Sequence, residues 1–147
     1  MSRVEVTEKI VATKLAKGLK WADVAKDIGQ SKEWTTTALL GQMQMNEEEA
    51  ATAAKIFDLT EEEAKWLTTC PYRGGLGQTV PTDALIYRFY EIIQVYGPTL
   101  KALIEEEYGD GIMSAIDFSM DIAKEENPAG NRVVVTLNGK FLPYKRY

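Results

Sequence analysis

Near the middle of the chain, a segment rich in glycine and proline interrupts the patterns that are typical of helices and strands. Residues 71–82 read Pro-Tyr-Arg-Gly-Gly-Leu-Gly-Gln-Thr-Val-Pro-Thr and hold three glycines and two prolines. Glycine leaves the backbone unrestrained and proline removes a backbone donor, so both disfavour a continuous helix or strand. The 147 residues suffice for two small units. We predict a first unit over residues 1–72, a linker over 73–82 and a second unit over 83–147.

The first unit has the pattern of several short helices. Gly29 follows one apolar helical face and is placed to turn the chain, after which Ser31 can cap the next helix. Asn46 and Thr60 each precede three glutamates, which favour the positive end of a helix dipole. The apolar face before Gly29 consists of Trp21, Val24, Ala25 and Ile28. These signals predict a helical bundle.

The two helices flanking Gly29 have the spacing of a helix-turn-helix motif. A DNA-reading second helix would present Arg, Lys, Asn or Gln to base edges in the major groove. Residues 31–40 instead offer Lys32 beside Glu33 and three threonines, and three lysines offset three acids over 20–41. This neutral surface and a net charge of -5 argue against nucleic acid as a partner. A DNA-binding regulator that oligomerises through its second unit is the alternative function.

The sequence pattern of the second unit predicts helices followed by strands. A helix over residues 84–96 is expected to end at Gly97, and Pro98 can open a second helix over 99–108. The two helices and the strands that follow predict an α+β fold.

The strand pattern begins after the glycine turn that follows residue 108. Apolar residues alternate within 112–122, and a β-branched run covers 132–137. Asn138-Gly139 is a strong hairpin signal that would return the chain through residues 140–142. A sheet of about three short strands in so small a unit is not expected to be stable alone. We therefore expect intersubunit pairing to complete the sheet, in an obligate oligomer.

Several classes of function are excluded by what the composition lacks. The chain has no histidine and one cysteine, which removes His-dependent catalysis, nearly every zinc site and an internal disulfide. No apolar run approaches the ~20 residues that span a bilayer. Acidic residues near the N-terminus do not fit a signal or transit peptide, so we expect a cytoplasmic protein.

Two isolated charges mark the first helix of the second unit. Arg88 and Glu91 are the only charged residues between Ile86 and Tyr96, and their spacing places them on one helical face. They could form an exposed ion pair, worth a few tenths of a kcal/mol. Alternatively, the Arg88 guanidinium binds a small anion, and Glu91 either orients the guanidinium or moves a proton. Ser114, after a glycine turn, could add a hydroxyl and a backbone N–H.

Distinctive segments occur through the second unit: Pro81-Thr82-Asp83, Tyr87–Glu91, Gln94–Gly97, Thr99–Leu103, Gly109–Ile116 and Thr136–Pro143. Together they resemble the cyanase (cyanate hydratase, or cyanate lyase) family. The first unit is similar more loosely, over residues 37–42, at Leu59 and at Arg73-Gly74.

The resemblance implies a fold and an activity. The fold would be an N-terminal bundle resembling a repressor-type helix-turn-helix domain, followed by C-terminal helices and a small β-sheet. The activity would be the detoxification of cyanate, in which bicarbonate-dependent decomposition gives ammonia and carbon dioxide via carbamate. The family's catalytic arginine, glutamate and serine fall on Arg88, Glu91 and Ser114. The resemblance further implies a homodecamer of dimers, with bicarbonate as co-substrate and no metal or organic cofactor.

Overall fold

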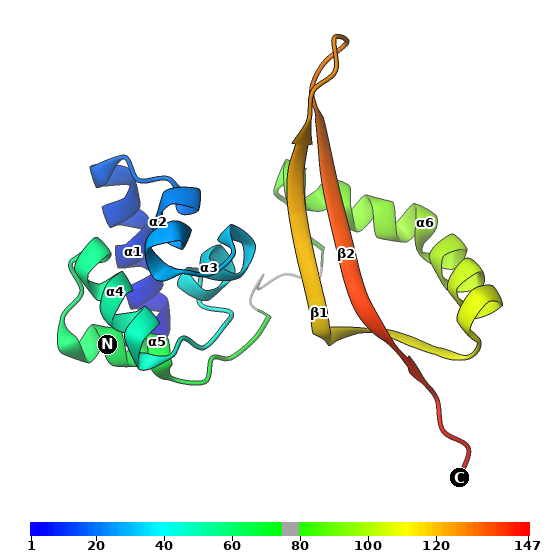
Figure 1. Ribbon diagram of the computed structural model, residues 1–147, viewed down its shortest axis with the longest axis horizontal. Coiled ribbons are helices and arrows are strands. Elements are labelled where there is room, and N and C mark those ends of the chain that lie inside the picture. The colour runs from blue at the N-terminus through cyan, green and yellow to red at the C-terminus, as the bar shows by residue number, and fades with distance from the viewer. Residues whose placement is uncertain (75–79) are drawn as a thin grey trace. The chain divides into compact units, whose positions relative to one another are not determined.

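The computed structural model describes residues 1–74 and 80–147 and shows an α+β protein, as predicted. In the described part, helices form the first half and a two-stranded antiparallel sheet ends the second (Figure 1). The predicted linker, 73–82, includes residues 75–79, which lie outside the described residues. None of the described helices is both long and apolar enough to cross a membrane.

The chain separates into two compact units, Met1–Gly75 and Leu76–Tyr147. The first contains α1 (Arg3–Lys17), α2 (Trp21–Ile28), α3 (Lys32–Leu39), α4 (Glu47–Phe57) and α5 (Glu61–Thr68). The second contains α6 (Ala84–Tyr108), β1 (Gly111–Glu125) and β2 (Arg132–Pro143).

The first unit has a hydrophobic core to which α1 through α5 all contribute. Burying apolar surface stabilises a fold by about 25 cal/mol per Å². Gly29 adopts a left-handed φ of 84° after α2, and the Ser31 hydroxyl accepts the Trp34 N–H at 3.1 Å to start α3, as predicted. The buried core residues are Val6, Ile10, Val24, Ala38, Leu39, Met45, Ala50, Ala53, Phe57 and Leu67.

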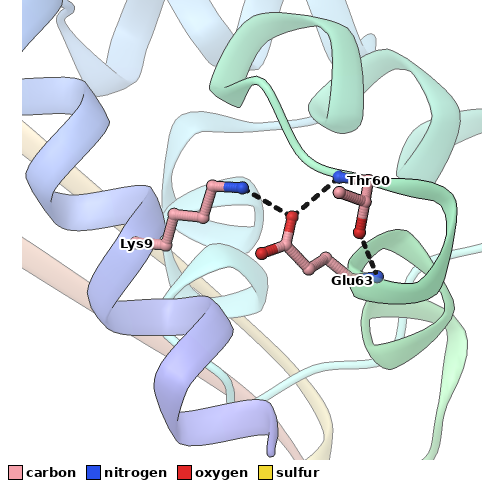
Figure 2. Close-up of polar contacts among 3 residues, drawn as sticks. All are labelled: Lys9, Thr60 and Glu63. Atoms are coloured by element: carbon pink, nitrogen blue, oxygen red, sulfur yellow. Dashed lines mark hydrogen bonds and ion pairs between the residues drawn. The ribbon is translucent and has the colours of Figure 1, made fainter. Parts of the chain in front are cut away.

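Two capping boxes start α4 and α5, and one of them also ties two helices together. Asn46 and Thr60 are the N-caps, as predicted, and the third glutamate after each closes the box. In the second box, Glu63 Oε2 accepts the Thr60 N–H at 2.7 Å and bonds Lys9 Nζ of α1 at 2.6 Å (Figure 2). Glu63 is buried, and the hydrogen bond from Lys9, followed by that from the Thr60 backbone, lowers its pKa.

This arrangement predicts a pH-dependent contribution to stability. Glu63→Gln should lower the thermal unfolding midpoint at pH 7 by a few degrees, because the amide can still accept the Thr60 N–H but loses the charge that faces Lys9. A carboxylate whose pKa is depressed by folding stabilises the protein above its ordinary value, here 4.5, and this stability is lost as the pH falls through the folded value. The gap between wild type and variant should therefore close as the pH falls below 4.5.

Circular dichroism melting curves recorded from pH 7 down to about pH 3 measure the difference in unfolding midpoint. This pH range covers the titration of carboxylates. The matched control is Glu61→Gln in the same helix, because the Glu61 side chain is 90% exposed and its pair with Lys65 should contribute little. If Glu63→Gln lowered the unfolding midpoint by the same amount at every pH, the carboxylate charge of Glu63 would not be the source of the stability.

The second unit begins with one long helix, so the prediction of two helices, 84–96 and 99–108, is wrong. Gly97 does not adopt the left-handed φ of a helix end, whereas Gly109, at φ 90°, does. Pro98 lies inside α6. Proline disfavours a helical residue before it by clashing with that residue's N–H and Cβ, and glycine lacks the Cβ. Gly97 therefore removes part of the clash, and α6 continues through the pair.

The sheet also differs from the prediction of about three short strands. β1 and β2 are 15 and 12 residues long, and they form a single antiparallel ribbon whose loop lies far from the α6–β1 connection (Figure 1). The predicted turn at Asn138-Gly139 is wrong, because both residues lie within β2 and Gly139 pairs with Phe118. The chain turns instead where Gly130 N–H donates to the Asn127 carbonyl at 3.0 Å, with Gly130 at φ 126°.

A single copy of the second unit has almost no core. Within the described residues 80–147, Ser114 is the only buried residue. One side of α6 carries exposed apolar residues at helical spacing, which we call the α6 apolar stripe: Phe89, Ile93, Tyr96, Leu100 and Leu103. Soluble monomers rarely expose contiguous apolar patches of this kind, so the unit alone leaves unusual apolar surface in water.

Candidate active site

Arg88 and Glu91 lie in the first third of α6. The helix start is fixed by Asp83, whose side chain accepts the N–H groups of Leu85 and Ile86, each at 2.9 Å. The helical spacing brings Arg88 Nη1 to 3.4 Å from Glu91 Oε2, with the two side chains 64% and 50% exposed. Such an exposed pair contributes about 0–1 kcal/mol, so the fold does not depend on it. Both groups are free to meet a ligand.

The pair borders a hollow with an apolar wall. The hollow is lined by Arg88, Glu91, Ile92, Val95 and Tyr96. Ile92 and Val95 follow Arg88 at i+4 and i+7, a helical periodicity from which the sequence could have assigned them to the same face. On the other side, the Arg88 guanidinium carbon lies 5.8 Å from the Tyr87 ring centroid. The guanidinium therefore has apolar and aromatic neighbours while it remains exposed to solvent.

Ser114 lies at a wide irregularity of the sheet. Regular pairing stops at Met113 and resumes at Phe118, so residues 114–117 of β1 face Lys140 alone on β2. A bulge of this kind bends a strand and redirects side chains, and bulges are common next to active sites.

The bulge determines what the Ser114 hydroxyl can do. Its oxygen accepts the N–H groups of Ile116 at 3.0 Å and Asp117 at 2.9 Å, and the residue is 4% exposed. A hydroxyl has two acceptor positions and one donor hydrogen. Both acceptor positions are used within the bulge, so the remaining capacity of Ser114 is to donate a hydrogen bond.

One copy of the chain brings together only two of the three predicted site residues. Gly139 packs against the Ser114 carbonyl and shares a hollow with Ile104, in the second half of α6. Glu91 and Ile104 are 13 residues apart on the helix, or roughly 20 Å at ~1.5 Å per residue. Ser114 therefore lies far from Arg88 and Glu91 within a single copy.

The chemistry of the three groups suits a small anion. A guanidinium offers a planar fork of donors, a hydroxyl adds one more, and a carboxylate can orient the guanidinium or carry a proton. Among residues 1–74 and 80–147, no cluster of three or more carboxylate or thiol side chains is placed to hold a metal ion.

Comparison with known proteins relates both units to one family. The family description "Cyanate lyase C-terminal domain" matches residues 78–146, and "Cyanate hydratase, N-terminal" matches residues 3–71. The cyanate hydratase of Methylibium petroleiphilum is 64% identical and that of Albidiferax ferrireducens 63% identical, each over the full length of both chains. The crystal structure of cyanase from T. urticae superposes with a TM-score of 0.80 at 39% identity, covering 94% of this chain and 96% of that one. The chain therefore belongs to the cyanase (cyanate hydratase) family.

Proposed function

We propose that this chain is a cyanate hydratase, a lyase that acts on cyanate, and that bicarbonate is its co-substrate. The observation that carries the proposal is the exposed Arg88–Glu91 pair beside an apolar wall, in a chain that matches cyanate hydratases over its full length. Binding two small anions requires a positively charged hydrogen-bond donor, and Arg88 is such a group whose side chain is not needed to stabilise the fold.

The reaction must overcome repulsion between two negative charges. A bicarbonate oxygen attacks the cyanate carbon and forms a doubly negative mixed anhydride. One proton is taken up as this gives carbamate and carbon dioxide, and a second as carbamate gives ammonia and carbon dioxide. Two unit charges ~4 Å apart repel by roughly 4 kcal/mol at an effective dielectric of ~20. Positive charge placed in advance around both anions would offset this repulsion.

A single Arg88 is insufficient for that charge, so we propose that Arg88 side chains of neighbouring copies converge on one site. Two observations support a site that another copy completes. The Arg88 side chain is 64% exposed, and Ser114 lies near the second half of α6, whereas Arg88 lies in its first third. In this arrangement Arg88 binds the anions, Ser114 donates its hydroxyl hydrogen to one of them, and Glu91 orients Arg88 or delivers a proton. No metal or organic cofactor has a part in it.

The second unit supplies a surface for assembly into a homodecamer. The α6 apolar stripe is exposed, and a two-stranded ribbon leaves both strand edges unpaired. Pairing of the ribbon with that of another copy would satisfy the edges and bury the stripe, as the sequence predicted for this small sheet.

The first unit retains the order of a helix-turn-helix motif, α2–Gly29–α3, and we propose that it serves as a scaffold. Lys32 Nζ lies 2.5 Å from Glu33 Oε1, so the first turn of α3 presents a neutralised pair where a DNA reader would present positive charge. The alternative function, a DNA-binding regulator, is not supported.

Ammonia release tests the proposed function directly. The purified protein should release ammonia from cyanate when bicarbonate is present, and the rate should fall to the uncatalysed level when carbon dioxide and bicarbonate are removed. Ammonia release that is absent under both conditions would refute the proposed activity. Release that is equal under both conditions would refute the role of bicarbonate alone.

A further inference from the structure

We propose that Gly139 is a positioning residue for Ser114: the missing side chain at 139 leaves the space that the Ser114 carbonyl occupies in the bulge. The inference rests on the proposed function, in which the Ser114 hydroxyl donates to a substrate anion.

The space at Gly139 is filled from the opposite strand. A Cβ built on Gly139 would overlap the Ser114 carbonyl oxygen and lie 2.6 Å from Met113 Cγ. Real Cβ atoms essentially never approach a neighbour closer than 3.0 Å, so one of the two strands would have to move. The contact with Met113 involves a flexible side chain, whereas the contact with Ser114 involves its backbone.

Gly139 is needed for space and not for backbone freedom. Its φ does not lie in the positive range that favours glycine, unlike that of Gly130 in the hairpin loop. Alanine is therefore compatible with the backbone at 139, and its main effect is the overlap with Ser114. A glycine inside a strand commonly marks such a close backbone approach.

Movement of the Ser114 carbonyl would also move its hydroxyl. The Oγ atom accepts the N–H groups of Ile116 and Asp117, so the oxygen is held by the same four-residue bulge whose first carbonyl touches Gly139. A backbone displacement at Ser114 turns the hydroxyl away from the direction in which it donates. An error of about 1 Å in a positioned group can cost about 100-fold in rate.

The experiment is a double-mutant cycle on kcat/KM for the assembled enzyme, with cyanate and bicarbonate varied separately. Gly139→Ala should lower kcat/KM by about 10- to 100-fold, similar to Ser114→Ala, the range expected for loss of a hydrogen bond to an anion. In the Ser114→Ala background, Gly139→Ala should cost little more, because the hydroxyl it misplaces is already absent.

Gly111→Ala is the matched control. A Cβ at Gly111 would overlap the Leu142 carbonyl oxygen and lie 2.5 Å from the Phe141 ring, so the same strand pair receives a comparable overlap. The three atoms nearest to this Cβ all belong to Leu142 and Phe141. Gly111→Ala should lower the thermal midpoint to a similar degree as Gly139→Ala and keep kcat/KM within about threefold, because its nearest neighbours, Leu142 and Phe141, have no proposed role in binding the transition state.

Three outcomes would overturn the inference while wild-type activity remains: Gly139→Ala with wild-type kcat/KM, a loss additive with that of Ser114→Ala, or an equal loss in Gly111→Ala. An inactive wild type would instead refute the proposed function. If Gly139→Ala does not assemble, the double variant Met113→Ala/Gly139→Ala replaces it in the test. Its kcat/KM is then compared with that of Met113→Ala alone. That pair removes the contact with Met113 Cγ and retains the overlap with Ser114.

Discussion

Replacing Arg88 with alanine is expected to reduce bicarbonate-dependent ammonia release by about 100- to 1,000-fold, because removing a preorganised group that stabilises transition-state charge costs about 10²–10³ in rate. The proposed reaction joins two anions, and Arg88 is an exposed cation beside an apolar wall. Loss of its charge from each converging copy would leave the repulsion between the anions uncompensated. Stability should change little, since the pair with Glu91 is exposed.

Steady-state kinetics with both substrates, together with the oligomer mass from light scattering, measures this expectation. Arg88→Lys should recover only part of the activity, because an ammonium keeps the charge but not the planar fork. Arg132→Ala, at the exposed start of β2, is the control for loss of one positive charge and should remain active. Near wild-type activity in Arg88→Ala would reduce Arg88 and Glu91 to a structural pair.

Ile93→Glu is expected to dissociate the assembly and remove activity together. Ile93 lies in the middle of the α6 apolar stripe and is 56% exposed in a single copy. If another copy covers the stripe, a buried glutamate without a partner costs several kcal/mol per chain. Because each site is proposed to need a second copy, the dissociated chains should not turn over cyanate.

Gln94→Glu is the matched control, since it introduces the same side chain one residue further along the helix and off the stripe. The Gln94 amide donates to the Tyr90 hydroxyl at 3.1 Å, and a glutamate there can still accept from that hydroxyl. Analytical ultracentrifugation should show smaller species for Ile93→Glu and an unchanged mass for Gln94→Glu. An intact, active Ile93→Glu oligomer would show that the stripe is not an interface.

The predictions from sequence that succeeded concern interactions between residues close in the chain. Caps at Ser31, Asn46 and Thr60 depend on a side chain bonding a backbone N–H three residues later, so composition at fixed spacing predicts them. The shared face of Arg88 and Glu91 follows from helical geometry in the same way. Their assignment to catalysis, with Ser114, rests on resemblance and stays a prediction.

Of the predictions that failed, one depended on residues distant in the chain and the other on an ambiguous local signal. Asn138-Gly139 fits a tight turn locally, but β1 approaches Gly139 so closely that only glycine fits within the strand. Gly97-Pro98 carries the signals of a helix end, yet the absence of a Cβ at 97 makes a continuous helix possible. In both cases one sequence signal is compatible with two backbone conformations, and at Gly139 the approach of β1 selects between them.

Local spacing and composition were sufficient to predict the helical first unit and the α+β class. Three other features depend on the folded chain: the register of β1 against β2, the bulge that leaves the Ser114 hydroxyl able only to donate, and the pairing of Lys9 with Glu63 across 54 residues. The physical reason is that each of these contacts joins chain segments whose approach is set by packing and backbone hydrogen bonding. A residue's own neighbours in the sequence do not encode which distant segment will lie against it.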